Sequence, residues 1–98
     1  MSEHATQDAR DRFAYLELQK IPNVGPAVAD DLLRLGIRTV EELAQQDPDD
    51  LYARLSALEG RKLDPCVRDV FAAVTAYAKG EPARPWWEFS RERKGELR

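Results

Sequence analysis

The sequence has a single cysteine, Cys66, and a single histidine, His4. One cysteine cannot close a disulfide within the chain, and one histidine with one cysteine cannot complete a tetrahedral zinc site of these ligand types. No apolar run approaches the roughly 18 residues that a membrane-spanning helix needs, and the polar first residues lack the apolar segment of a secretory signal. These absences predict a cytoplasmic protein that is stabilised by packing, without a metal or another cofactor.

Basic residues are few for a nucleic-acid-binding protein. The 98 residues include 15 lysines and arginines and 18 aspartates and glutamates, so the net charge is −3. Residues 81–98 hold one basic residue more than acidic ones, and the acidity therefore lies in the body of the chain. Because affinity for DNA rises with the number of phosphates neutralised, any DNA binding is expected to be weak and sensitive to salt.

Prolines and glycines divide the chain into short helical segments. The hydrophobic content of 43% and the charged content of 34% suit one small globular domain. The apolar spacing and the helix start and stop signals predict an all-α fold with no strand. Five short helices are expected, at about residues 9–19, 26–35, 40–44, 48–59 and 65–79. Phe13, Leu16 and Leu58 are expected to face the core.

The helical segments suggest three parts of the chain. Residues 1–8 are expected to form a flexible leader, and residues 9–80 the helical domain. Residues 81–98 form a tail rich in proline and tryptophan, which we expect to be partly packed with a flexible charged end.

The stretch LELQKIPNVGPAVADDLL, residues 16–33, has the pattern of a helix-hairpin-helix. Asn23 and Gly25 can adopt a positive φ at low cost, and Pro26 is a favoured first residue of the next helix. Backbone N–H groups exposed beside a helix N-terminus form a natural binding site for a phosphate. The alternative is a plain helix connector whose glycine serves only the turn.

A looser copy of this pattern follows. The turn at residues 58–63 has one glycine and two basic residues, so we interpret it as a degenerate second hairpin. Two hairpins joined by the short helix at residues 40–44 would span both strands of a duplex at the minor groove.

The stretches IPNVGPAVADDLLRLGIRTVEELAQQDPDDLYARLSALEG and LDPCVRDVFAAV, followed by the pair Trp86-Trp87, occur together in order. In this combination the chain resembles the bacterial pathogenicity-locus family of helix-hairpin-helix proteins, some of which are described as mitomycin-resistance proteins. The resemblance implies a tandem helix-hairpin-helix fold related to proteins of DNA repair and processing. The chain departs from the strongest DNA-binding hairpins because Asn23 replaces a glycine and Asp30 and Asp31 follow the turn.

Two functions are therefore open. The first is sequence-independent DNA binding through hairpin backbone amides. The second is a protein-interaction adaptor for DNA-processing proteins, which the acidic body favours. No catalytic residues are predicted, and Cys66 is expected to be a buried, inert thiol. The expected DNA contacts are turn amides and neighbouring basic side chains: Lys20, Asn23, Val24, Gly25, Ala27, Arg34, Arg38, Gly60, Arg61 and Lys62.

The tail concentrates three aromatic residues, Trp86, Trp87 and Phe89, after two prolines. One interpretation is that the rings fold back over a groove between the first and last helices of the domain and enlarge a small core. The other is that they form a contact surface for a partner or for unpaired bases, with Arg91, Arg93 and Lys94 beside them.

Overall fold

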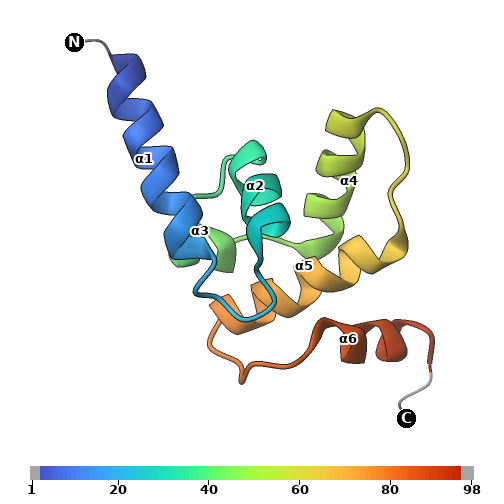
Figure 1. Cartoon of the computed structure of the whole chain (residues 1–98). Coiled ribbons are helices and arrows are strands. Elements are labelled where there is room, and N and C mark those ends of the chain that lie inside the picture. The colour runs from blue at the N-terminus through green and yellow to red at the C-terminus, as the bar shows by residue number, and fades with distance from the viewer. Residues whose placement is uncertain (1–2, 96–98) are drawn as a thin grey trace.

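A computed structural model of the chain describes residues 3–95, which form α-helices and no strand (Figure 1). The all-α prediction is therefore confirmed. The helices are α1 (Glu3–Leu18), α2 (Pro26–Arg34), α3 (Val40–Ala44), α4 (Pro48–Glu59), α5 (Pro65–Ala78) and α6 (Trp86–Arg93).

Side chains at the starts of three helices explain where those helices begin. Thr39, Asp47 and Asp64 each accept a hydrogen bond from a backbone N–H of the first helical turn, at 3.0, 3.1 and 2.8 Å. Such caps satisfy N–H groups that have no partner within the helix. Pro48 and Pro65 follow two of these caps as first helical residues.

The predicted number of five helices is wrong, because the tail contains α6. Pro85 precedes the helix as its N-cap residue, a position where a proline costs no helical hydrogen bond. The start of α1 also differs, because the helix begins at Glu3 and not near Ala9. Residues 3–8, expected in the leader, therefore continue α1, while residues 1–2 and 96–98 of the expected flexible ends lie outside the described residues.

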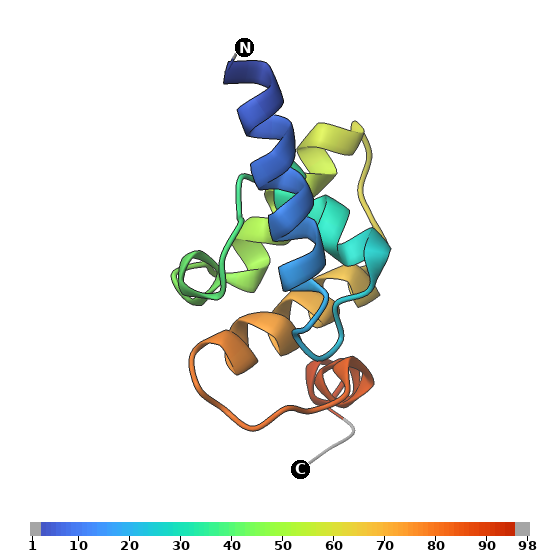
Figure 2. The ribbon, with the colours of Figure 1, turned by 60° about the vertical axis from the view of Figure 1, so that its left-hand side comes forward.

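Helix α5 is the centre of the packing. It contacts α3, α4 and α6, whereas α1 pairs with α2 (Figure 1). The N-terminal half of α1 projects from the body in both views (Figures 1 and 2), and the molecule measures 56 × 31 × 21 Å. The most deeply buried core side chains come from five helices and the chain after α2: Leu18, Leu32, Ile37, Leu43, Leu51, Leu55, Phe71 and Val74.

Three expected core residues lie at the surface. Phe13 is 66% exposed and Leu16 is 57% exposed, because Ala14 and Leu18, four residues apart, carry the buried side of α1. Leu58 is 54% exposed in the last turn of α4, beyond the buried Leu55.

None of the helices within residues 3–95 is long and apolar enough to cross a membrane.

Candidate nucleic-acid interface

The turn between α1 and α2 is held at both ends by buried side chains. Ile21 and Val24 are 4% and 6% exposed, and the Val24 N–H donates to the Ile21 carbonyl oxygen at 3.0 Å. Asn23 has a φ of 75°, so a proline followed by a residue of positive φ closes the turn. This is the residue pattern of a type II turn. The positive φ predicted for Asn23 is confirmed.

Gly25 does not adopt the positive φ that we expected. Its φ is −98° and its ψ is −170°, an extended conformation open to any residue, and it acts as the N-cap of α2. The turn needs only one residue of positive φ, because the chain already reverses its direction at Asn23. A Cβ atom at Gly25 would meet no atom within 4 Å, so this position has room for a side chain.

Three backbone N–H groups at this turn have no partner among residues 3–95: those of Asn23, Gly25 and Ala27. The start of α2 has no side-chain cap, so its first donors remain available. Of the four amides in the predicted site, only that of Val24 is already used, in the turn itself. The arrangement can accept an anion through backbone donors at the positive end of the helix dipole.

The side chain of Asn23 ties the turn to the tail. Its Nδ2 donates to the Arg84 carbonyl oxygen at 2.8 Å, and its Oδ1 accepts from the Trp86 N–H at 3.2 Å. A glycine at this position could form the turn but neither of these bonds. The contact joins residues more than 60 positions apart, so no local sequence pattern could have indicated it.

The basic side chains predicted beside the first turn are all paired within the chain. Lys20 contacts Glu17 at 2.9 Å and remains 73% exposed. Arg38 contacts Asp11 of α1 at 2.8 Å, away from the turn. Surface pairs of this kind contribute little stability and can rearrange when another anion approaches.

Arg34 lies at the other end of α2 from the first turn. Its guanidinium contacts Glu59 at 2.7 Å and Asp31 at 3.6 Å. The hydrogen bond from Arg34 lowers the pKa of Glu59, and burial raises the pKa of Asp31. Arg34 therefore belongs with the second turn and joins the C-terminal ends of α2 and α4.

The second turn differs from the first in what it exposes. Gly60 has a φ of 74° and ends α4, and its N–H donates to the Ala57 carbonyl oxygen at 3.2 Å. The Arg61 N–H likewise donates to the Ser56 carbonyl oxygen at 3.2 Å. Both amides are therefore already hydrogen-bonded within the chain. The groups that remain available at the second turn are its side chains. The charged ends of Arg61 and Lys62 form no ion pair within the described part of the chain.

The two turns lie apart in the molecule, because the chain after α4 turns near the top of both views and the chain after α1 turns well below it (Figures 1 and 2). The predicted contact residues divide into three groups. The first turn has free amides, and Arg38 lies apart with Asp11. At the second turn Arg61 and Lys62 form no ion pair among residues 9–95, whereas Arg34 pairs with Glu59.

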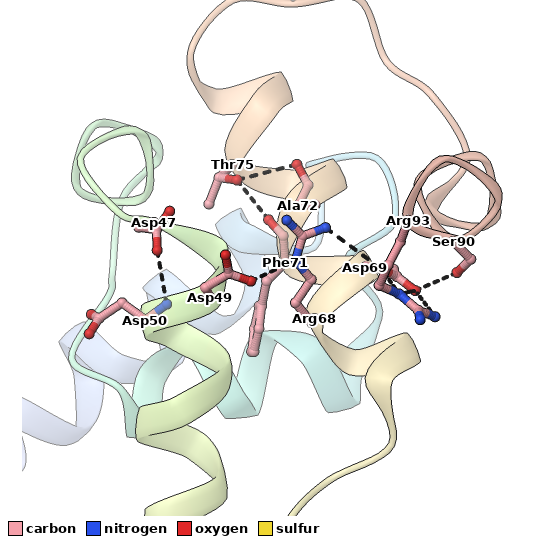
Figure 3. Close-up of polar contacts among 10 residues, drawn as sticks. All are labelled: Asp47, Asp49, Asp50, Arg68, Asp69, Phe71, Ala72, Thr75, Ser90 and Arg93. Carbon is pink, nitrogen blue, oxygen red and sulfur yellow. Dashed lines mark hydrogen bonds and ion pairs between the residues drawn. The ribbon is translucent and has the colours of Figure 1, made fainter. Parts of the chain in front are cut away.

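A buried carboxylate holds α6 in place beside this region. Asp69 of α5 has no exposed surface and accepts hydrogen bonds from Ser90 at 2.6 Å and from the Arg93 guanidinium at 2.9 Å (Figure 3). Burial alone would raise the pKa of Asp69, but the bonds from Arg93 and Ser90 outweigh it and leave the pKa below its usual value. An acidic side chain within a helix is normally exposed to solvent, so no sequence pattern indicated this buried contact.

The packed tail agrees in part with the first interpretation of its aromatic residues. Helix α6 packs on α5, and the Arg84 guanidinium lies 4.3 Å from the centre of the Phe89 ring. Trp86 is half-buried and meets Trp87 edge-on at 6.0 Å, but Trp87 itself is 54% exposed.

Cys66 is half-buried near the start of α5, and its hydrogen bond with Asp64, with further contributions from burial, raises the pKa of the thiol. A raised pKa disfavours the reactive thiolate. Among residues 9–95, whose side chains the structure describes, no three His, Cys, Asp or Glu side chains are placed to hold a metal ion.

Comparison with known proteins agrees with the resemblance in the motifs. Residues 11–95 match the sequence model of the family described as "Pathogenicity locus". The chain belongs to the pathogenicity-locus family. One relative, described as "Mitomycin resistance protein McrB", comes from Streptomyces lavendulae and is 44% identical over 78 residues. That alignment covers 80% of this chain and 74% of the relative. No solved structure matches this family member.

Proposed function

We propose that this protein is a non-catalytic, sequence-independent DNA-binding module of the tandem helix-hairpin-helix type, which acts in the cytoplasm in DNA repair or processing. The observation that carries the proposal is the uncapped start of α2. There the N–H groups of Gly25 and Ala27, together with that of Asn23, have no acceptor among residues 3–95. Backbone donors at a helix start suit a phosphate, which carries no information about base sequence.

The choice of glycine at position 25 supports this proposal. The φ of Gly25 does not require a glycine, and no neighbouring atom in the chain would meet a Cβ. A glycine is also favoured where an external group must approach the backbone closely. A phosphate oxygen bound to the Gly25 and Ala27 amides is such a group.

The second turn would bind the other strand by a different means. Its amides are used in ending α4, so Arg61 and Lys62 would neutralise phosphates through their side chains. Binding through amides at the first turn and through side chains at the second agrees with the interpretation of the second hairpin as degenerate. It also predicts which residues set the salt dependence, because counterion release follows the number of cations that contact phosphates.

The salt dependence of duplex binding tests this proposal. Fluorescence anisotropy of a labelled duplex between about 20 and 150 mM salt should show weak binding that is equal for unrelated base sequences. The variant Arg61→Ala/Lys62→Ala should reduce the slope of log affinity against log salt by about 2. The matched variant Arg10→Ala/Arg12→Ala removes two exposed cations from α1 and should leave that slope unchanged. Equal slopes for both variants would exclude the second turn from the interface.

An adaptor function is the second candidate, and a specific surface favours it. Phe13 and Leu16 of α1 and Val40 of α3 are exposed apolar residues, at 66%, 57% and 38%. Phe13 and Val40 line a cavity of about 230 Å³ together with Arg38 and Glu41. An apolar side chain of a partner would fit there. The adaptor function predicts no affinity for any DNA at low salt and a saturable protein partner.

A further inference from the structure

The exposed side of α6 combines one aromatic ring with two cations. Trp87, Arg91 and Lys94 are all exposed and stand at positions i, i+4 and i+7 of the same segment. This spacing places them in one line along a helix. We call these three residues the α6 face.

The cations of the α6 face have no ion-pair partner among residues 9–95. Glu88 and Glu92, the acidic residues of α6, both pair with Arg84, which precedes the helix. Arg93 is bound to the buried Asp69 (Figure 3). Arg91 and Lys94 form no ion pair with any side chain of residues 9–95. The pairing of its other charges thus leaves α6 with two free positive charges on one side.

The α6 face begins beside the free amides of the first turn. The Trp86 N–H donates to the Asn23 side chain, so the residue directly before Trp87 is hydrogen-bonded to the turn. A strand bound at the turn would need to extend only a short way to reach the Trp87 ring. The residues of the face then continue at intervals of about 6 and 4.5 Å along the helix. These intervals are of the same order as the spacing of phosphates along a strand.

We propose that the α6 face binds a single-stranded stretch of DNA next to the duplex held at the turns. An unpaired base stacks on the Trp87 ring, and Arg91 and Lys94 contact the phosphates that follow. A positively charged track with an exposed aromatic ring is the usual composition of a surface that binds single strands. This inference rests on the proposed DNA-binding function and names its substrate class: DNA in which a duplex meets unpaired bases.

Three labelled DNAs test the inference by anisotropy at about 20 mM salt: a blunt duplex, the same duplex with a five-nucleotide overhang, and an oligo(dT) strand. The wild type should bind the overhang DNA more tightly than the blunt duplex. Trp87→Ala should abolish that preference, with a loss of about tenfold on the overhang DNA and little change on the blunt duplex. Phe13→Ala is the matched control, because it removes an exposed ring from α1, and it should retain the preference.

The two cations are tested in the same way. Arg91→Ala/Lys94→Ala should lower the salt slope on oligo(dT) by about 1.4, whereas Arg10→Ala/Arg12→Ala, with the same change in net charge, should not. Equal binding of the blunt and overhang duplexes, unaffected by Trp87→Ala, would overturn the inference and leave the amide site of the first turn standing. Absence of binding to all three DNAs would overturn both.

Discussion

Asn23 makes two separable contributions to stability, and its replacement measures each of them. Its side chain forms two hydrogen bonds with the tail, at 2.8 and 3.2 Å, and its backbone has a φ of 75°. Each hydrogen bond contributes about 0.5–1.5 kcal/mol net, so their loss should cost about 1–3 kcal/mol. An ordinary residue at positive φ adds about 1–2 kcal/mol of strain, which a glycine avoids.

Asn23→Gly should therefore lower the free energy of unfolding by about 1–3 kcal/mol, and Asn23→Ala by about 2–5 kcal/mol. In a domain of this size each 1 kcal/mol corresponds to a shift of about 4–8 °C in Tm. The assay is urea denaturation followed by circular dichroism, with thermal melts beside it. Gln19→Ala is the control, because it removes a hydrogen bond between neighbouring turns, 3.1 Å from the Tyr15 carbonyl oxygen, without touching the tail.

The free energy of unfolding should therefore fall in the order wild type, Asn23→Gly, Asn23→Ala. If Asn23→Gly were as stable as the wild type, the bonds to Arg84 and Trp86 would contribute nothing to the attachment of the tail. If Asn23→Ala matched Asn23→Gly, the turn would not need a positive φ in solution.

Asp69→Asn should lower the free energy of unfolding, measured by urea denaturation, by about 1.5–3 kcal/mol, because Ser90 and the partly exposed Arg93 would lose their hydrogen bonds to a charged acceptor. Asp49→Asn, at a carboxylate 70% exposed, should lower it by less than about 1 kcal/mol. Because the pKa of Asp69 is lowered in the folded protein, its stabilisation is present above the unfolded value of about 3.9 and is lost as the pH falls through the folded value. Thermal melts from pH 5 to pH 2 should therefore show a steeper loss for the wild type than for Asp69→Asn, and parallel curves would contradict the assignment. Removal of residues 86–98 should lower the Tm by more than about 10 °C, since it strips α6 from α5; an unchanged Tm would mean that the tail is only loosely attached.

The helix boundaries of the domain could be predicted because they depend on local chemistry. Thr39, Asp47 and Asp64 cap their helices through their own side chains, and these bonds involve residues at most three positions apart. Gly60, at a φ of 74°, ends α4 for an equally local reason.

The sequence-based predictions that proved wrong depend on contacts between distant segments of the chain. Asp69 is buried only because Ser90 and Arg93 of a later helix meet it, and α6 formed where two prolines indicated irregular chain. Phe13 and Leu16 resemble core residues in spacing, but no element covers that side of α1. Apolar periodicity identifies an amphipathic helix without indicating which of two apolar sides is buried.

The candidate site was predictable as a turn but not in its details. The sequence located the free amides of Gly25 and Ala27, because a glycine and a proline at a helix start are local features. It could not show that Asn23 reaches the tail or that Arg34 and Arg38 are paired elsewhere.

The central claim is that a phosphate binds the backbone at Gly25, and binding of a labelled duplex by Gly25→Glu at about 20 mM salt tests it most directly. The φ of Gly25 and the room for a side chain at this position allow this substitution without strain, so the variant should keep the melting temperature of the wild type. Its carboxylate would occupy the phosphate position and repel the strand. Ala53→Glu adds the same charge on the exposed side of α4 and serves as the control. We predict that Gly25→Glu loses duplex binding while Ala53→Glu retains it; equal binding by the two folded variants would contradict the account.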